Sequence, residues 1–110
     1  MNLGLDHDGV LTAEENGFKQ FCKIMRDLGH KVYIVTMRYP SESKEIFENW
    51  GPHVDGIFTT SRQAKHLHMS LLDIKIHVWI DDHPQCIHQD AVQVWGFSHP
   101  EGQTHVPIHD

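Results

Sequence analysis

Residues 2–9 read NLGLDHDG, a short apolar run that ends in two aspartates and a glycine. Residues two apart in an extended chain point to the same side, so a strand over this run would place the carboxylates of Asp6 and Asp8 together at its carboxyl end. Ligands of open parallel sheets bind at that end of the strands, which makes the position of the two aspartates informative. A lone DxDG sequence, however, is more often a plain strand followed by a turn.

Apolar runs alternate with amphipathic stretches along the rest of the chain. The runs are NLGLD, KVYIVT, DGIFT, IHVWID and AVQVW. Between them, helical spacing predicts one buried helix face made of Phe18, Phe21, Cys22, Met25 and Leu28, and another made of Ala64, Leu67 and Leu71. This alternation predicts an α/β fold in which a doubly wound parallel sheet is covered by helices on both faces, giving three layers.

Length and composition favour one globular domain over residues 1–110, with an irregular tail at 98–110. The chain has 39% hydrophobic and 22% charged residues, and its net charge is −6. The nine Lys and Arg residues are scattered, so nucleic acid is expected only as a substrate and not on a broad basic surface. No apolar run is long enough to cross a bilayer and the two cysteines are far apart, so we expect a cytoplasmic protein with reduced thiols and no membrane partner.

A second acidic pair, Asp81 and Asp82, ends the run IHVWI as Asp6 and Asp8 end the first run. If the two strands are neighbours, three or four carboxylates converge at one edge and form an oxygen-rich site suited to Mg²⁺. Thr36 ends KVYIVT, and Lys65 lies early in the third helical stretch. Taken singly, Thr36 is a common strand-end residue and Lys65 a common solvated helix charge, so the ordered set is more specific than either.

That ordered set resembles the haloacid dehalogenase superfamily of phosphotransferases. The four motifs of this superfamily are a DxDG strand end, a strand-end Thr or Ser, a Lys and a strand-end acidic pair, and residues 80–84, IDDHP, are similar to the hhDDxP form of nucleotidases. The resemblance spans residues 3 to about 87. It implies a Rossmann-like fold without a cap domain, because neither the segment after Asp8 nor the one after Thr36 is long enough to contain one.

The resemblance also implies a function: a Mg²⁺-dependent phosphomonoester hydrolase that forms an aspartyl-phosphate. Asp6 would be the nucleophile and Asp8 the general acid and base, which requires the pKa of Asp8 to rise towards neutrality. Thr36 and Lys65 would bind the phosphoryl oxygens together with backbone amides near Gly9, and Arg38 would contact the leaving group. Asp6, the Asp8 carbonyl and Asp82 would hold the metal, with Asp81 behind Asp82.

An uncapped site implies a large phosphorylated substrate, such as a polynucleotide end, or a lid borrowed from a second subunit in a homo-oligomer. Two other readings stay open. One is a catalytically silent protein of the same fold that binds phosphate or a partner. The other is a zinc or regulatory site built from His83, Cys86 and His88 with His66, His68 and His99, although their spacing matches no standard zinc pattern.

Overall fold

The computed structural model describes residues 1–96, so the tail expected at 98–110 lies outside the described residues. Its four strands are β1 (Asn2–Leu5), β2 (Lys31–Thr36), β3 (Gly56–Thr59) and β4 (Val78–Ile80). They form one sheet in the order β3-β2-β1-β4, and all three pairings are parallel. The described chain is therefore α/β with a parallel sheet, compatible with a Rossmann-like fold.

The helices follow the strands in alternation. They are α1 (Glu15–Asp27), α2 (Lys44–Trp50), α3 (Lys65–Leu71), α4 (Gln85–His88) and α5 (Ala91–Trp95), with the short turns η1 (His7–Leu11), η2 (Pro40–Glu42) and η3 (Gly51–His53). Only η1 and η2 occupy the segments after β1 and β2 where a cap domain would be inserted. Among the described residues, no helix has the length and apolar character that crossing a bilayer requires.

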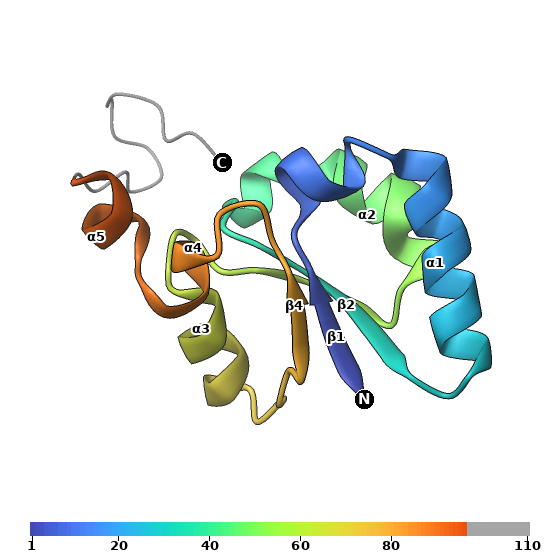
Figure 1. The fold of residues 1–110 in the computed structure, drawn as a ribbon. Coiled ribbons are helices and arrows are strands. Elements are labelled where there is room, and N and C mark those ends of the chain that lie inside the picture. Colours follow the sequence, from blue (N-terminus) through green and yellow to red (C-terminus); the bar gives the residue numbers. More distant parts are fainter. Residues whose placement is uncertain (97–110) are drawn as a thin grey trace.

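The strand order explains which side of the sheet each helix covers. From β1 the chain moves outward to β2 and β3, and it then returns to β4 on the other side of β1. Right-handed crossovers in opposite directions put their helices on opposite faces. Accordingly, α1 and α2 lie on one side of the sheet and α3 and α4 on the other (Figure 1).

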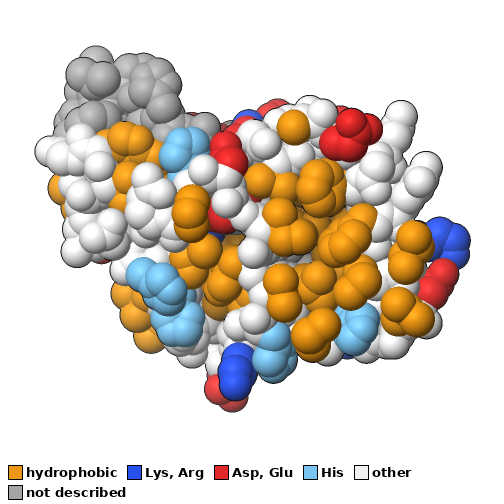
Figure 2. Space-filling model, in the orientation of Figure 1, with side chains coloured by type: hydrophobic (Ala, Val, Ile, Leu, Met, Phe, Trp, Pro, Cys, Tyr) orange, Lys and Arg blue, Asp and Glu red, His pale blue; other side chains and the backbone are white. Residues whose placement is uncertain are grey.

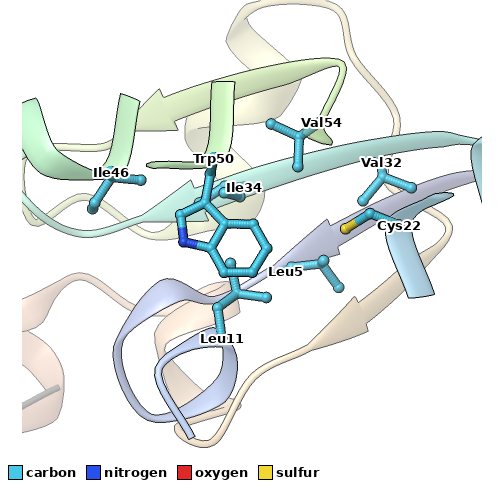
Figure 3. Close-up of a cluster of buried hydrophobic side chains, with 8 residues drawn as sticks. All are labelled: Leu5, Leu11, Cys22, Val32, Ile34, Ile46, Trp50 and Val54. Atoms are coloured by element: carbon cyan, nitrogen blue, oxygen red, sulfur yellow. The ribbon is translucent and has the colours of Figure 1, made fainter. Parts of the chain in front are cut away.

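The main hydrophobic core lies between the sheet and the helices α1 and α2. It consists of Leu5, Leu11, Cys22, Val32, Ile34, Ile46, Trp50 and Val54. Figure 3 shows the Trp50 ring among these side chains, close to Leu5 and Leu11. Leu11 reaches the core because η1 turns the chain back over the end of β1. The segment that follows the carboxyl end of β1 therefore also contributes a side chain to the core.

Three local expectations are wrong. AVQVW forms the helix α5 and not a fifth strand, because Asp90 and Gln93 make a reciprocal capping box and Gly96 ends the helix with φ 77°. Leu28 follows the last residue of α1 and is exposed. On α3 the buried side chains are Lys65 and Met69, whereas Leu67 and Leu71 are exposed.

Strand β4 lies at the edge of the sheet, and no strand among residues 1–96 pairs with its outer side. Val78 is exposed there, and its register partner on β1 is Leu3. Figure 2 shows hydrophobic side chains gathered over β4 and β1 and beside α1.

The core predicts a large difference between two isoleucines. Ile34 in β2 is 0% exposed and Ile24 in α1 is 57% exposed. We expect Ile34→Ala to lower the free energy of unfolding by about 2–5 kcal/mol, because it removes buried methyl groups and leaves a cavity. Ile24→Ala, the matched control, should change it by less than about 0.5 kcal/mol. Urea denaturation followed by circular dichroism measures both, and equal losses would contradict this description of the core.

Candidate active site

The polar residues meet at the carboxyl edge of the sheet. Asp6 directly follows β1, and its amide donates to the carbonyl of Ile80, the last residue of β4, at 2.9 Å. Asp81 comes next in the chain, so the two acidic strand ends lie side by side. Strands β2 and β3 are added on one side of β1 and β4 on the other, so the strand order reverses between β1 and β4. Open α/β sheets bind ligands in the crevice at such a point.

Lys65 joins the two strand ends. As the first residue of α3, it reaches this edge from the face opposite α1. Its ammonium donates to Asp6 Oδ1 at 2.9 Å and to Asp81 Oδ2 at 2.6 Å. The three side chains are only 3%, 6% and 2% exposed, respectively. A buried cation between two carboxyl groups is a charge-assisted arrangement, and removing Lys65 would leave both of them buried without a cationic partner.

The start of α3 is itself held in place by the segment around α5. Asp90 accepts a hydrogen bond from the Ala64 amide at 2.7 Å, and the Ala91 amide donates to the Arg62 carbonyl at 2.9 Å. These contacts fix the residues immediately before Lys65. The helical state of residues 91–95 therefore bears directly on the position of the ammonium.

Asp82 completes a group of three carboxylates. Asp6, Asp81 and Asp82 each offer an oxygen, and these oxygens lie within 4.8 Å of one another. Asp82 also hydrogen-bonds with Asp6. Gly9 passes so close that a Cβ atom there would collide with the Asp82 carboxylate, and its φ of 87° also favours glycine. Oxygen donors at this spacing can hold a hard cation such as Mg²⁺.

The pKa of Asp6 is raised to about 8 in the metal-free protein, chiefly because its carboxyl group is buried; the charge of Lys65 opposes this rise, and Asp82 and Asp81 contribute to it. Burial by itself would raise the pKa of Asp82 too, but hydrogen bonding with Asp6 and the nearby His83 lower it below its ordinary value. Without metal, Asp6 therefore favours its neutral form and Asp82 its anionic form.

The partners and the pKa of Asp8 differ from those expected for a general acid. Arg38 donates from Nη2 to Asp8 Oδ1 at 2.6 Å and from Nε to Asp8 Oδ2 at 2.9 Å. His7 Nδ1 lies 3.3 Å from Asp8 Oδ1. Burial alone would raise the pKa of Asp8, but the hydrogen bonds from His7 and Arg38 and the charge of Arg38 hold it well below its usual range. The expected rise towards neutrality is wrong for this state, because the anion has a bidentate cationic partner.

Asp6 and Asp8 therefore take different partners, although they are only two residues apart. Asp8 has extended backbone angles and Gly9 is left-handed, so the chain bends inside η1. Asp6 interacts with β4 and α3, and Asp8 interacts with the loop after β2. The carboxylate of Asp8 consequently lies outside the three-carboxylate group.

Thr36 and Gly9 lie at the predicted edge, but their polar groups already have partners. Thr36 is buried at the end of β2, and its Oγ1 accepts a hydrogen bond from the Arg38 amide at 3.4 Å. The Gly9 amide donates to Thr12 Oγ1 at 3.0 Å. Contact of either group with a phosphoryl oxygen stays a prediction.

The histidines of the zinc reading do not form a cluster in the described part of the chain. The three carboxylates are the one group of three or more metal-ligating side chains found among residues 1–96. His66 and His88 pack ring to ring with centroids 5.3 Å apart, and Cys86 is buried. His83 lies beside the candidate site, where its amide donates to Asp81 Oδ1 at 2.9 Å. His99 lies outside the described residues.

Two acidic partners of Arg38 were not singled out from the sequence. Arg38 Nη1 donates to the Glu42 carbonyl at 2.7 Å and to Glu45 Oε1 at 2.8 Å. Both glutamates are exposed, and in the sequence they look like any acidic residues near the start of a helix. The one available signal was their position seven residues or fewer after Arg38.

A larger hollow, about 510 Å³, lies at the opposite end of the sheet between the end of α1 and η3. Its charged residues pair with one another, as Lys23 does with Asp27 and Arg26 with Asp55. No group of three metal-ligating side chains from the described residues lies there. The candidate site is therefore assigned to the carboxyl edge on its chemistry and not on the size of the hollow.

No known protein family, curated protein or solved structure matches the chain. The case for function therefore rests on the motifs and on the geometry at the carboxyl edge.

The raised pKa of Asp6 predicts how stability depends on pH without metal. The folded protein keeps a proton on Asp6 up to about pH 8, whereas the unfolded chain releases it near the ordinary value of 3.8. The folded state binds more protons between these limits, so its free energy of unfolding should fall as pH rises, by at most about 1.4 kcal/mol per pH unit. Urea denaturation between pH 5 and pH 8 in the presence of a chelator measures this. In Asp6→Asn the free energy of unfolding should depend less on pH. Identical slopes in the wild type and the variant would contradict the raised pKa of Asp6.

Proposed function

We propose that this protein is a Mg²⁺-dependent phosphomonoester hydrolase of the haloacid dehalogenase type, which transfers the phosphoryl group first to Asp6 and then to water. The observation that supports this most strongly is the buried Lys65 ammonium between Asp6 and Asp81, beside Asp82. In the resembling superfamily the lysine and the acidic pair come from separate motifs, and here both sit against the first aspartate. The three-layer wrapping of that superfamily is part of the same proposal.

The donor set fits Mg²⁺. Asp6 and Asp82 supply carboxylate oxygens that lie within 4.8 Å of each other, and metal binding would displace the proton that the raised pKa of Asp6 retains. Both oxygens of Asp81 already have donors, one from Lys65 and one from the His83 amide, so its role is to position the lysine. Mg²⁺ would neutralise charge on the phosphoryl group, and the Asp8 carbonyl would be a further ligand.

The chain's own residues account for the two chemical steps. Asp6 attacks phosphorus, and the bond from phosphorus to the leaving oxygen breaks while Asp8, released from Arg38 and protonated from solvent, gives that oxygen a proton. A water then attacks the aspartyl-phosphate, Asp8 takes its proton, and the Asp6 carboxylate is released. Lys65 stabilises the anionic form of Asp6 before attack and the phosphoryl oxygens afterwards, and Thr36 contributes its hydroxyl at the neighbouring strand end.

The open edge suits a substrate larger than the phosphoryl group itself. Among the described residues, only η1 and η2 stand between β1 or β2 and the next helix, so no cap domain inserted there restricts a nucleotide, a polynucleotide end or another phosphomonoester. The paired state of Asp8 and Arg38 favours one second candidate, a silent protein of this fold that binds phosphate without hydrolysing it. Turnover separates the two.

Phosphate release from an aryl phosphate tests the proposal. We expect Mg²⁺-dependent turnover by the wild type and a loss of at least about 100-fold in Asp6→Asn, which removes the nucleophile with little change of shape. Asp27→Asn is the matched control, since Asp27 is exposed at the end of α1 and pairs with Lys23. Equal activity in wild type and Asp6→Asn would contradict the proposal, and metal-dependent binding without turnover would favour the silent candidate.

The two motif-four aspartates should respond differently to metal. Saturating Mg²⁺ should raise the melting temperature of the wild type, because a ligand that binds only the folded state stabilises it. Asp82→Asn should lose most of this rise. Asp81→Asn should keep it but melt lower at every Mg²⁺ concentration, since it leaves Lys65 with one partner fewer. Thermal melts at several Mg²⁺ concentrations measure both, and the reverse pattern would assign the direct ligand to Asp81.

A further inference from the structure

Arg38 is the most fully engaged side chain at the rim of the site. It donates four hydrogen bonds, two to Asp8, one to the Glu42 carbonyl and one to Glu45. Its side chain is 22% exposed and follows β2 by two residues. It is therefore a partly buried cation whose donors point at the group that must meet the leaving oxygen.

Both carboxylate oxygens of Asp8 are taken by this guanidinium, at 2.6 Å and 2.9 Å. A leaving-group oxygen needs one of those oxygens within hydrogen-bond reach to exchange a proton with it. In the observed arrangement the approach of a substrate is not enough. Arg38 has to release at least one oxygen of Asp8 first.

A guanidinium that releases Asp8 keeps only the exposed Glu45 as its anionic partner, so another anion brought by the substrate favours the release, because a partly desolvated charge is costly to leave weakly paired. We propose that the substrate carries a second oxyanion on its leaving group, a carboxylate or a phosphate, which takes over Arg38 and frees Asp8. This inference rests on the proposed function and names its substrate class. Since Arg38 contacts Asp8 directly, the second oxyanion lies within a few bonds of the scissile oxygen.

The side chains around Arg38 allow an incoming oxyanion to replace an acidic partner. Glu45, which shares the guanidinium with Asp8, is 72% exposed and can move into solvent when another anion arrives. A second guanidinium lies close by: Arg62 is 3.3 Å from Glu42 and stacks on the Tyr39 ring at 4.9 Å. The loops after β2 and β3 thus present two arginines at the open rim, both paired with acidic groups that an oxyanion can replace.

A substrate with a neutral leaving group would have no second oxyanion to draw Arg38 away from Asp8. A plain alcohol or unsubstituted aryl group leaves Arg38 on Asp8 and should bind more weakly and react more slowly. The inference concerns selectivity between substrates, so ligand binding measures it independently of turnover.

Calorimetric titration with three non-hydrolysable phosphonates in the presence of Mg²⁺ tests the inference. The probes are propylphosphonate and the same three-carbon chain ending in a carboxylate or in a second phosphonate. We expect at least one of the two probes with a second anionic group to bind the wild type at least about tenfold more tightly than propylphosphonate, as a charge-assisted pair with an arginine requires. The tighter of the two identifies the source of the oxyanion. Equal affinities, or no binding of any probe, would overturn the inference.

Variants make the assignment specific to Arg38. Arg38→Gln should reduce the preference to within about twofold, whereas Arg26→Gln, at the opposite end of the sheet, should keep it. Glu45→Gln removes a competing anion and should tighten binding of the two probes that carry a second anionic group. Glu48→Gln, on the same helix, should not. An unchanged preference in Arg38→Gln would overturn the inference. A clear preference in a protein without phosphatase turnover would instead support the inference and contradict the proposed function.

Discussion

The ammonium of Lys65 lies between two carboxylates that follow different strands, and the arrangement of the carboxyl edge depends on this contact. Asp6 and Asp81 are almost fully buried, and neither has another cationic side chain among its recorded partners in the described chain. The lysine offsets part of the cost of burying the two carboxyl groups side by side, although burial still raises the pKa of Asp6 to about 8. Two cationic side chains thus pair with three of the four aspartates: Lys65 binds Asp6 and Asp81, and Arg38 binds Asp8.

The topology makes this pairing possible. Because β4 returns to the far side of β1, the two acidic strand ends become neighbours, and α3 must cross the opposite face of the sheet to reach them. Its first residue is then delivered to the same edge. The contacts of Asp90 with Ala64 and of Ala91 with Arg62 fix that first turn, which links the short α5 to the chemistry at the site. A helix at residues 91–95 thus contributes to the site, although none of its side chains reaches the carboxylates.

The parallel sheet and the meeting of Asp6, Lys65, Asp81 and Asp82 followed from the sequence, because apolar runs that end in acidic residues fix both the strand and its polar end. The orientation of Asp8 did not follow, since it depends on a left-handed Gly9 and on the direction taken by Arg38 after β2. The strand predicted for AVQVW failed because apolar periodicity over five residues does not distinguish a strand from a helix. The deciding signal was the capping pair of Asp90 and Gln93, which lies at the boundary of the run.

The central claim is that Asp6 carries the phosphoryl group during turnover. Rapid acid quenching of the reacting protein, followed by borohydride reduction and peptide mass spectrometry, tests it most directly, because an aspartyl-phosphate is reduced to homoserine whereas a free aspartate is not. The account predicts homoserine at position 6, formed only when Mg²⁺ and a phosphomonoester are both present. Phosphate release with no reduced residue, or reduction at Asp8 in place of Asp6, would contradict it.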